Sequence, residues 1–399
     1  MTTRSARLRS DDGSMMLTML AAIIIGGLVV ALFSTSITGQ QRVRDDRDYQ
    51  HVINGANAGL QQAVAVISEL EEDDLDTVIL TSDDMDDTSL DGIDFTWEAT
   101  RESPISWNLA GVGELNGVER HVEARAVRDA MFFVAAFADL GFVMRGDNEV
   151  RSYTDLAYDT GFGAVGSNGE IEIRGNSSWV DLIMLMGGDA DCTSGHRCDD
   201  RPITGLPDKL DLDAVLEDIQ AGMDAACAPS DFRSYDAEAD GPLQAGETYC
   251  LTELVVGQHE DLVVEDASQD DPAIVYINNG VLETGNHSTT NCDGTTWNAC
   301  TTAERPESQS LQIYSTGTQV RLGNQSAIAA AVSAPRANCS GSPSNAQADI
   351  FGAMVCNDLT NQGGWDFNFD ERLLNLGSGQ FELKDWREEP GGTTSASTD

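Results

Sequence analysis

The residues whose types and spacing come closest to a metal site are Cys192, His196 and Cys198. Thiolate and imidazole groups bind zinc, and a structural zinc site needs four such ligands. No fourth ligand is evident nearby, so a disulfide-closed loop is the favoured interpretation of this cluster. The acidic segment 83–87 does not follow the spacing of an EF-hand calcium loop. The sequence therefore predicts no resident metal and no cofactor.

All eight cysteines follow residue 190, and an even number confined to one part of the chain fits disulfides in an oxidising compartment. Eight cysteines allow about 105 pairings, and the sequence does not choose among them. Sequential pairing is the most economical hypothesis, because each bond then closes a short loop. It gives the pairs Cys192–Cys198, Cys227–Cys250, Cys292–Cys300 and Cys339–Cys356.

Catalytic motifs are absent from the sequence. None of the five histidines lies in a hydrolase elbow or an HExxH motif, and there is no phosphate-binding glycine-rich loop. With 67 acidic residues, carboxylates that are close in sequence carry little information. The net charge of −44 opposes binding to nucleic acid. We expect a protein that is not an enzyme; a surface enzyme acting on carbohydrate is the alternative.

An uncharged, mostly apolar run occupies residues 14–33 near the start of the chain. As a helix it would span roughly 30 Å, which is enough to cross the core of a bilayer. The preceding leader carries Arg4, Arg7 and Arg9, which predicts a cytoplasmic N-terminus and export of the remainder. A plain membrane anchor and a secretory signal peptide are the competing interpretations.

Gly13 separates the leader from this run, and the arrangement resembles the N-terminus of type IV pilins. More closely, the segments 12–17 and 40–44 resemble PilX-type pilus assembly proteins. The resemblance implies that a prepilin peptidase cleaves between Gly13 and Ser14. Major pilins carry Glu at the fifth mature position, where this chain has Thr18. Thr18 therefore implies different helix packing and a minor or tip subunit.

After the apolar run, the sequence predicts a continued helix and then a small antiparallel sheet. Apolar residues recur every three or four positions through residues 42–70, which extends the predicted helix to 14–70. Alternating runs at 93–100, 106–113 and 118–127, separated by turn residues, predict an antiparallel meander. A helix followed by a small sheet is the order of a pilin head.

From about residue 140 the chain becomes rich in Gly, Asn, Ser and β-branched residues. Short strands repeatedly end in Gly-Asn-x-Ser, at 175–178, 285–288 and 323–326, and each such group predicts a sharp corner. Stacked coils of a β-solenoid explain this pattern, and a β-sandwich is the alternative. The succession of segments from 311 to 388 resembles the C-terminal domain often joined to PilX-type N-termini.

The predicted fold class is α+β: a long pilin-like helix with a small antiparallel sheet, then a mainly-β domain. The predicted parts are a leader (1–13), a transmembrane and stalk helix (14–70), a sheet head (71–139), a β-rich extracellular domain with an insertion near 191–268 (140–390) and a disordered tail (391–399).

We expect a PilX-like minor pilin, held in the cell membrane by residues 14–33, with most of the chain extracellular in a pilus or pseudopilus. Its expected role is filament priming, adhesion or tip display. The expected partners are other pilin subunits, the pilus-assembly machinery, a prepilin peptidase and the membrane, but not nucleic acid.

Overall fold

The protein is described here from a computed structural model of the 399-residue chain. The described residues are 12–68, 79–82, 89–90, 92–103, 105–128, 130–146, 148–153, 163–174, 179–180, 182–185, 190–192, 197–198, 210–266, 271–292, 300, 307–342, 346–376 and 381–389. The side chains of 12–18, 21–23, 26–27, 30–31, 41, 45, 90, 103, 179, 182, 185, 190–192, 197–198, 375 and 389 lie outside this description.

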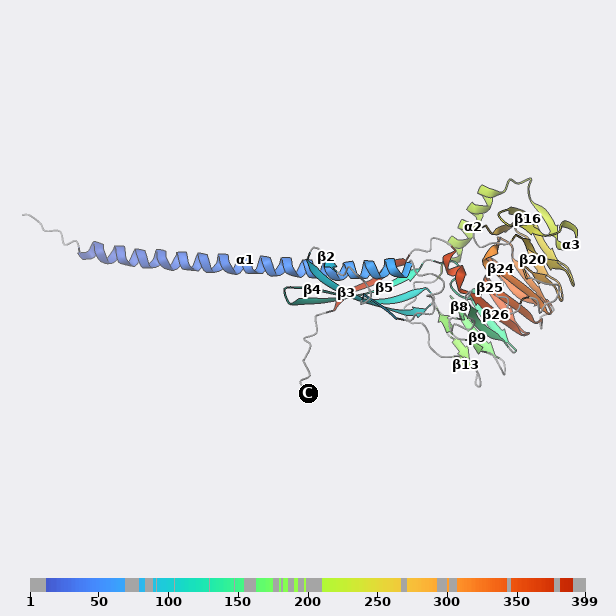
Figure 1. Cartoon of the computed structure of the whole chain (residues 1–399), viewed down its shortest axis with the longest axis horizontal. Coiled ribbons are helices and arrows are strands. Elements are labelled where there is room, and N and C mark those ends of the chain that lie inside the picture. Colours follow the sequence, from blue (N-terminus) through green and yellow to red (C-terminus); the bar gives the residue numbers. More distant parts are fainter. Residues whose placement is uncertain are drawn as a thin grey trace, which may run out of the picture.

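The molecule is elongated, with a long helix at one end and a β-rich domain at the other (Figure 1). Helix α1 (Asp12–Ser68) has 57 residues, and its first half extends beyond every other element. An antiparallel sheet lies along the second half of α1, between the exposed part of the helix and the distal domain.

The antiparallel sheet has the strand order β1-β3-β4-β5-β27, with β2 paired to β3. The meander predicted from residues 93–127 is present, because β4 pairs antiparallel with both β3 and β5. The C-terminal strand β27 returns from the distal domain and pairs with β5. The strands are β1 (Ile79–Thr81), β2 (Ser89–Leu90), β3 (Ile93–Ser103), β4 (Ser106–Leu115), β5 (Val118–Arg128) and β27 (Phe381–Glu389).

The distal domain contains a 19-stranded sheet, whose pairings between strands are parallel. Its first strands are β6 (Ala136–Arg145), β7 (Glu149–Tyr153), β8 (Ala164–Ser167), β9 (Glu170–Arg174), β10 (Trp179–Val180), β11 (Leu182–Leu185), β12 (Ala190–Cys192) and β13 (Arg197–Cys198). A strand here often pairs with the strand three places later, as β7 does with β10 and β8 with β11.

The remaining strands of this sheet follow helix α2 (Leu212–Ala226). They are β14 (Arg233–Asp236), β16 (Thr248–Val256), β17 (Asp261–Leu262), β19 (Ala273–Ile277), β20 (Val281–Thr284), β21 (Thr289–Thr290), β22 (Leu311–Ser315), β23 (Gln319–Gly323), β24 (Ser326–Ser342), β25 (Ala348–Asn361) and β26 (Trp365–Asp370). The smaller elements are α3 (Ala237–Asp240), β15 (Leu243–Gln244), β18 (Val264–Glu265), η3 (Ser308–Ser310) and η4 (Glu371–Asn375).

The predicted fold class is wrong. Strands make up 54% of the structure, so the chain is mostly β, and its parallel strands close into a six-stranded barrel rather than forming a solenoid or a sandwich. The parallel pairings run from β16 through β19, β22, β24, β23 and β20 back to β16. The physical cause is the length of β16 and β24. The first part of β16 pairs with β19 and its last part with β20, while β24 pairs with β22 and then with β23, so the row of strands turns back on itself.

A continuous apolar core fills the distal domain and reaches the end of the antiparallel sheet. Phe132 and Phe133 of the segment between β5 and β6 are buried together with Phe137 of β6, and Ile105 and Val127 at the end of the antiparallel sheet belong to the same cluster. At about 25 cal/mol per Å² of apolar area, burial of this kind is the main favourable term in folding. The two sheets therefore share a packed joint.

The predicted membrane location is also wrong. A helix that crosses a bilayer needs about 20 consecutive residues that are mostly apolar. In the part of the chain that the structure describes, no helix is both long enough and apolar enough to do so.

Candidate assembly helix and sheet groove

The first half of α1 exposes large apolar side chains to solvent. Their exposed fractions reach 66% at Met19, 67% at Leu32 and 66% at Phe33. The exposed set is Met19, Leu20, Ile24, Ile25, Leu28, Val29, Leu32, Phe33, Ile37 and Val43. Exposed apolar groups at this density mark a surface that another molecule covers.

The second half of α1 buries one face against the antiparallel sheet. Val52, Ala56, Leu60, Ala63 and Ile67 recur every three or four residues and are at most 1% exposed. This stripe holds the helix on one face of the sheet, so the two halves of the helix have different surroundings.

Close backbone contact and polar anchors keep this packing in register. A Cβ atom at Gly111 of β4 would lie 2.6 Å from the carbonyl oxygen of Ala56, so only glycine fits there. The indole Nε1 of Trp97 donates a hydrogen bond to Gln62 Oε1 at 2.9 Å. The indole Nε1 of Trp386, on β27, donates to Asn57 Oδ1 at 2.7 Å.

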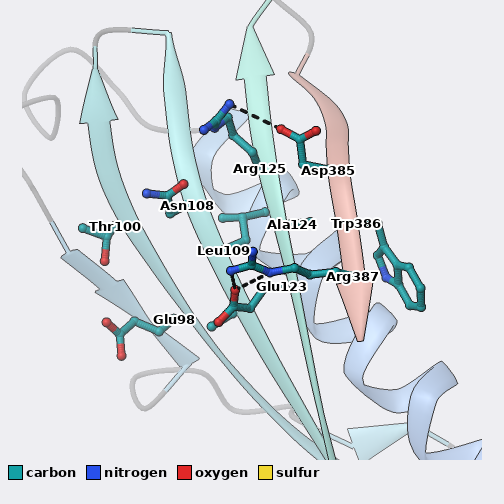
Figure 2. Close-up of a pocket in the computed structure, with 11 residues that line it drawn as sticks. Glu98, Thr100, Asn108, Leu109, Glu123, Ala124, Arg125, Asp385, Trp386 and Arg387 are labelled. Atoms are coloured by element: carbon teal, nitrogen blue, oxygen red, sulfur yellow. Dashed lines mark hydrogen bonds and ion pairs between the residues drawn. The ribbon is translucent and has the colours of Figure 1, made fainter. Parts of the chain in front are cut away.

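The outer face of the sheet carries a groove of about 740 Å³ (Figure 2). Its residues come from the consecutive strands β3, β4 and β5 and from β27, which is far from them in the sequence. They are Glu98, Thr100, Asn108, Leu109, Ala110, Glu123, Ala124, Arg125, Asp385, Trp386 and Arg387. Sequence reasoning did not find this site. The alternation of apolar and polar residues in 381–384 signals a strand, but no sequence pattern indicates that the strand pairs with β5.

A bulge in β27 shapes the groove. The register of β27 on β5 shifts between Lys384 and Arg387, and Asp385 takes a left-handed backbone with φ of 54°. Asp385 then lies 3.3 Å from Nη1 of Arg125, and Arg387 donates from Nε to Glu123 Oε2 at 2.9 Å. Both arginines are engaged by carboxylates, so this side of the groove is lined by paired charges.

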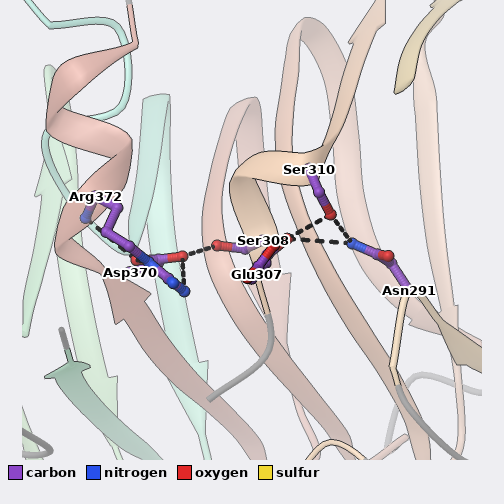
Figure 3. A network of polar contacts seen from close by, with 6 residues as sticks. All are labelled: Asn291, Glu307, Ser308, Ser310, Asp370 and Arg372. Atoms are coloured by element: carbon purple, nitrogen blue, oxygen red, sulfur yellow. Dashed lines mark hydrogen bonds and ion pairs between the residues drawn. The ribbon is translucent and has the colours of Figure 1, made fainter. Parts of the chain in front are cut away.

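A buried polar network lies inside the distal domain (Figure 3). Arg372 donates two hydrogen bonds to the carboxylate of Asp370, from Nε at 2.7 Å and from Nη2 at 2.9 Å. The Ser308 hydroxyl donates to the same carboxylate. Burial, followed by the charge of Asp370, raises the pKa of Tyr153 well above its ordinary value. Asp370 and Ser308 are fully buried, so the network lies in the interior of the domain.

A second part of this network fixes the loop before β22. Asn291 Nδ2 donates to Ser310 Oγ and to the carbonyl oxygen of Ala329, each at 3.0 Å. Ser310 Oγ donates in turn to the carbonyl oxygen of Glu307 at 2.7 Å. These bonds satisfy buried backbone groups, as a close-packed interior requires.

The predicted processing and packing residues lie in the first turns of α1. Gly13, Ser14 and Thr18 belong to the helix by their backbone, and their side chains lie outside the described residues. Cleavage after Gly13 and the packing role of Thr18 remain predictions.

Three of the four predicted disulfides are present, namely Cys227–Cys250, Cys292–Cys300 and Cys339–Cys356. The last links β24 to β25 with 6.1 Å between the Cα atoms. Cys192 ends β12 and Cys198 ends β13, but both side chains lie outside the described residues, as does His196. Within the described residues, no three or more His, Cys, Asp and Glu side chains gather to hold a metal ion. The acidic segment 83–87 also lies outside them.

Comparison with known proteins gives few matches. Residues 212–376 match a family described as "Domain of unknown function (DUF7305)". No curated protein matches this chain. Among solved structures, the chain is similar to the competence-associated pilin ComZ from Thermus thermophilus, at 11% identity and a TM-score of 0.30, over 86% of this chain and 97% of that one. The similarity is thus to a pilin, and no comparison supports the PilX type in particular.

Proposed function

We propose that this protein is a minor subunit of a pilus-type filament, with a structural rather than a catalytic role. The observation that carries the proposal is the division of α1 into an exposed apolar half and a half packed under the sheet. Helices of neighbouring subunits offer the apolar surface that would cover the exposed half. The groove and the distal domain lie away from this part of the helix and would be displayed for binding.

The finer points of the proposal come from the sequence. A prepilin peptidase would cleave after Gly13, which leaves Ser14 as the mature N-terminus and Thr18 at the fifth position. Without a carboxylate there, the ammonium of a neighbouring subunit would be buried without its usual partner, and an unpaired buried charge costs several kcal/mol. The subunit would therefore enter filaments rarely, with other pilin subunits and the assembly machinery as partners.

The proposal is tested by charging the exposed half of the helix. Leu28→Glu should remove the protein from sheared filaments of the native host, because a carboxylate is costly in an apolar helix contact. The matched control is Gln61→Glu, which introduces the same charge at an exposed position over the sheet. Equal incorporation of both variants, measured by immunoblot of the filament fraction, would contradict the proposal.

Processing is tested separately by mass spectrometry of the N-terminus. A mature chain that starts at Ser14 is expected, and the net charge of −44 then becomes −45, because the leader carries three arginines and two aspartates. The leader is residues 1–13, which include both Asp11 and Asp12; an intact leader, or a start beyond Phe33, would contradict this point.

A further inference from the structure

Three turns of the distal domain are stacked on one another, at 257–260, 285–288 and 323–326; we call them the turn stack. Each begins with glycine, and the third residue of each takes a left-handed backbone. The φ angles are 63° at His259, 58° at His287 and 56° at Gln325. The two later turns are Gly-Asn-x-Ser motifs, and the structure adds 257–260 as a third copy with a different sequence.

Backbone hydrogen bonds join the turns and set their spacing. The amide of His259 donates to the carbonyl oxygen of Asn286, and the amide of His287 donates to that of Asn324, both at 3.0 Å. A Cβ atom at Gly285 would lie 2.5 Å from the amide nitrogen of Gln258, so the first residue of that turn must be glycine. Equivalent side chains of successive turns are therefore held one above the other.

The imidazole rings of His259 and His287 are stacked as a consequence. Their centroids lie 4.9 Å apart and their planes differ by 6°. The side-chain nitrogen of Gln258 lies 3.3 Å from Nε2 of His259, so the Gln258 amide is within hydrogen-bonding distance of the ring. His259 is exposed and His287 is half-buried, so the pair is open to solvent on one side.

The turn itself does not require histidine. Glycine or asparagine adopts a left-handed backbone with the least strain, yet two successive turns place an imidazole there. Imidazole is the common protein ligand of zinc and of other borderline divalent metals. The chain's net charge of −44 also favours cations near its surface.

We propose that His259 and His287 form a two-histidine site for a divalent transition metal such as Zn²⁺. The stacked rings hold their nitrogens in parallel planes, so both side chains would have to turn out of the stack to bring one nitrogen each within about 2.0–2.1 Å of a single zinc ion. A half-turn of the Gln258 amide would offer its carbonyl oxygen as a third ligand. Gln325, at the equivalent place in the next turn, continues the column, and water completes the coordination.

The test uses the full chain with its disulfides intact and without a polyhistidine tag. Binding of Zn²⁺ is measured at constant pH by competition with a chromophoric chelator. All proteins carry His196→Asn, so that zinc at the Cys192 segment does not contribute. His259→Asn and His287→Asn each keep a residue that tolerates the left-handed turn. Each should weaken zinc binding by about tenfold or more, since even indirect partners of a metal contribute this much.

His121→Asn is the matched control, because His121 lies on β5, where it contacts Glu119 at 2.7 Å, outside the turn stack. It should leave zinc binding unchanged. Zinc should also raise the thermal midpoint of the parent and not that of the double variant His259→Asn/His287→Asn, while both have the same midpoint without zinc. Equal zinc affinity in the parent and the double variant, or no zinc binding by the parent, would overturn the proposal.

Discussion

Arg101 of β3 and Glu371 of η4 form a buried ion pair between the antiparallel sheet and the distal domain. Arg101 Nη2 lies 3.3 Å from Glu371 Oε2, and the two side chains are 1% and 0% exposed. The pair lies where two chain segments already connect the parts, one leading from β5 to β6 and one from η4 to β27. This ion pair adds a polar contact to the apolar joint between the two sheets.

Glu371→Gln should therefore lower the free energy of unfolding by about 3–5 kcal/mol, because it leaves a buried arginine without its carboxylate. Glu283→Gln is the control. Glu283 contacts Arg321 at the same distance of 3.3 Å, but the side chains are 41% and 42% exposed. Such surface pairs contribute about 1 kcal/mol or less. Urea denaturation measures both variants, and a similar effect of the two would show that the joint pair has no special role.

Gly111→Ala should weaken the packing of α1 on the sheet. The added Cβ meets the carbonyl oxygen of Ala56 at 2.6 Å, and backbone cannot move aside cheaply. A loss of about 1–3 kcal/mol in the free energy of unfolding is expected. The control is Gly39→Ala in the exposed half of α1, where the added Cβ meets no atom within 4 Å beyond its own stretch of helix, and it should stabilise the protein by up to about 1 kcal/mol. Thermal unfolding of the two variants should therefore shift in opposite directions.

The disulfide between Cys339 and Cys356 should contribute to stability, because both residues are buried in the distal core. Replacing both with serine should cost about 2–4 kcal/mol through the greater freedom of the unfolded chain. Chemical denaturation under non-reducing conditions gives the value. Non-reducing peptide mapping of the parent should recover this linkage, and a free thiol at either position would contradict it.

Asp349 should make stability depend on pH. It lies beside Asp366 in the register of β25 and β26, and burial, followed by the charge of Asp366, raises the pKa of Asp349 to about 7. The folded state thus holds this proton more tightly than the unfolded state. The contribution to stability is fully present below pH ~4 and is lost as the pH rises through about 7.

Asp349→Asn should therefore raise the free energy of unfolding at pH 8, by an amount on the order of 1–3 kcal/mol, and change it little at pH 4. Denaturation curves at the two pH values measure this difference. Asp94→Asn, at an exposed position on β3, is the control for removing one negative charge. An effect of Asp349→Asn that is equal at both pH values would contradict the assignment.

The sequence by itself determined the local elements of this protein. The apolar stripe of Val52, Ala56 and Leu60 predicts a helix with one buried face, and the alternation in 93–127 predicts three paired strands. The Gly-Asn-x-Ser groups predict sharp corners, and His287 and Gln325 do take left-handed backbone there. These features are readable because side-chain periodicity and glycine's conformational freedom act within a few residues.

Only the tertiary structure decided which distant segments meet. The closure of the parallel strands depends on β16 pairing with both β19 and β20 and on β24 pairing with both β22 and β23. The groove depends on β27 returning to β5 after some 250 residues. The ion pair of Arg101 and Glu371 depends on how the antiparallel sheet meets the distal domain. The stacking of His259 on His287 depends on the alignment of two successive turns. None of these follows from local pattern, because pairing between distant segments is set by the packing of the whole chain.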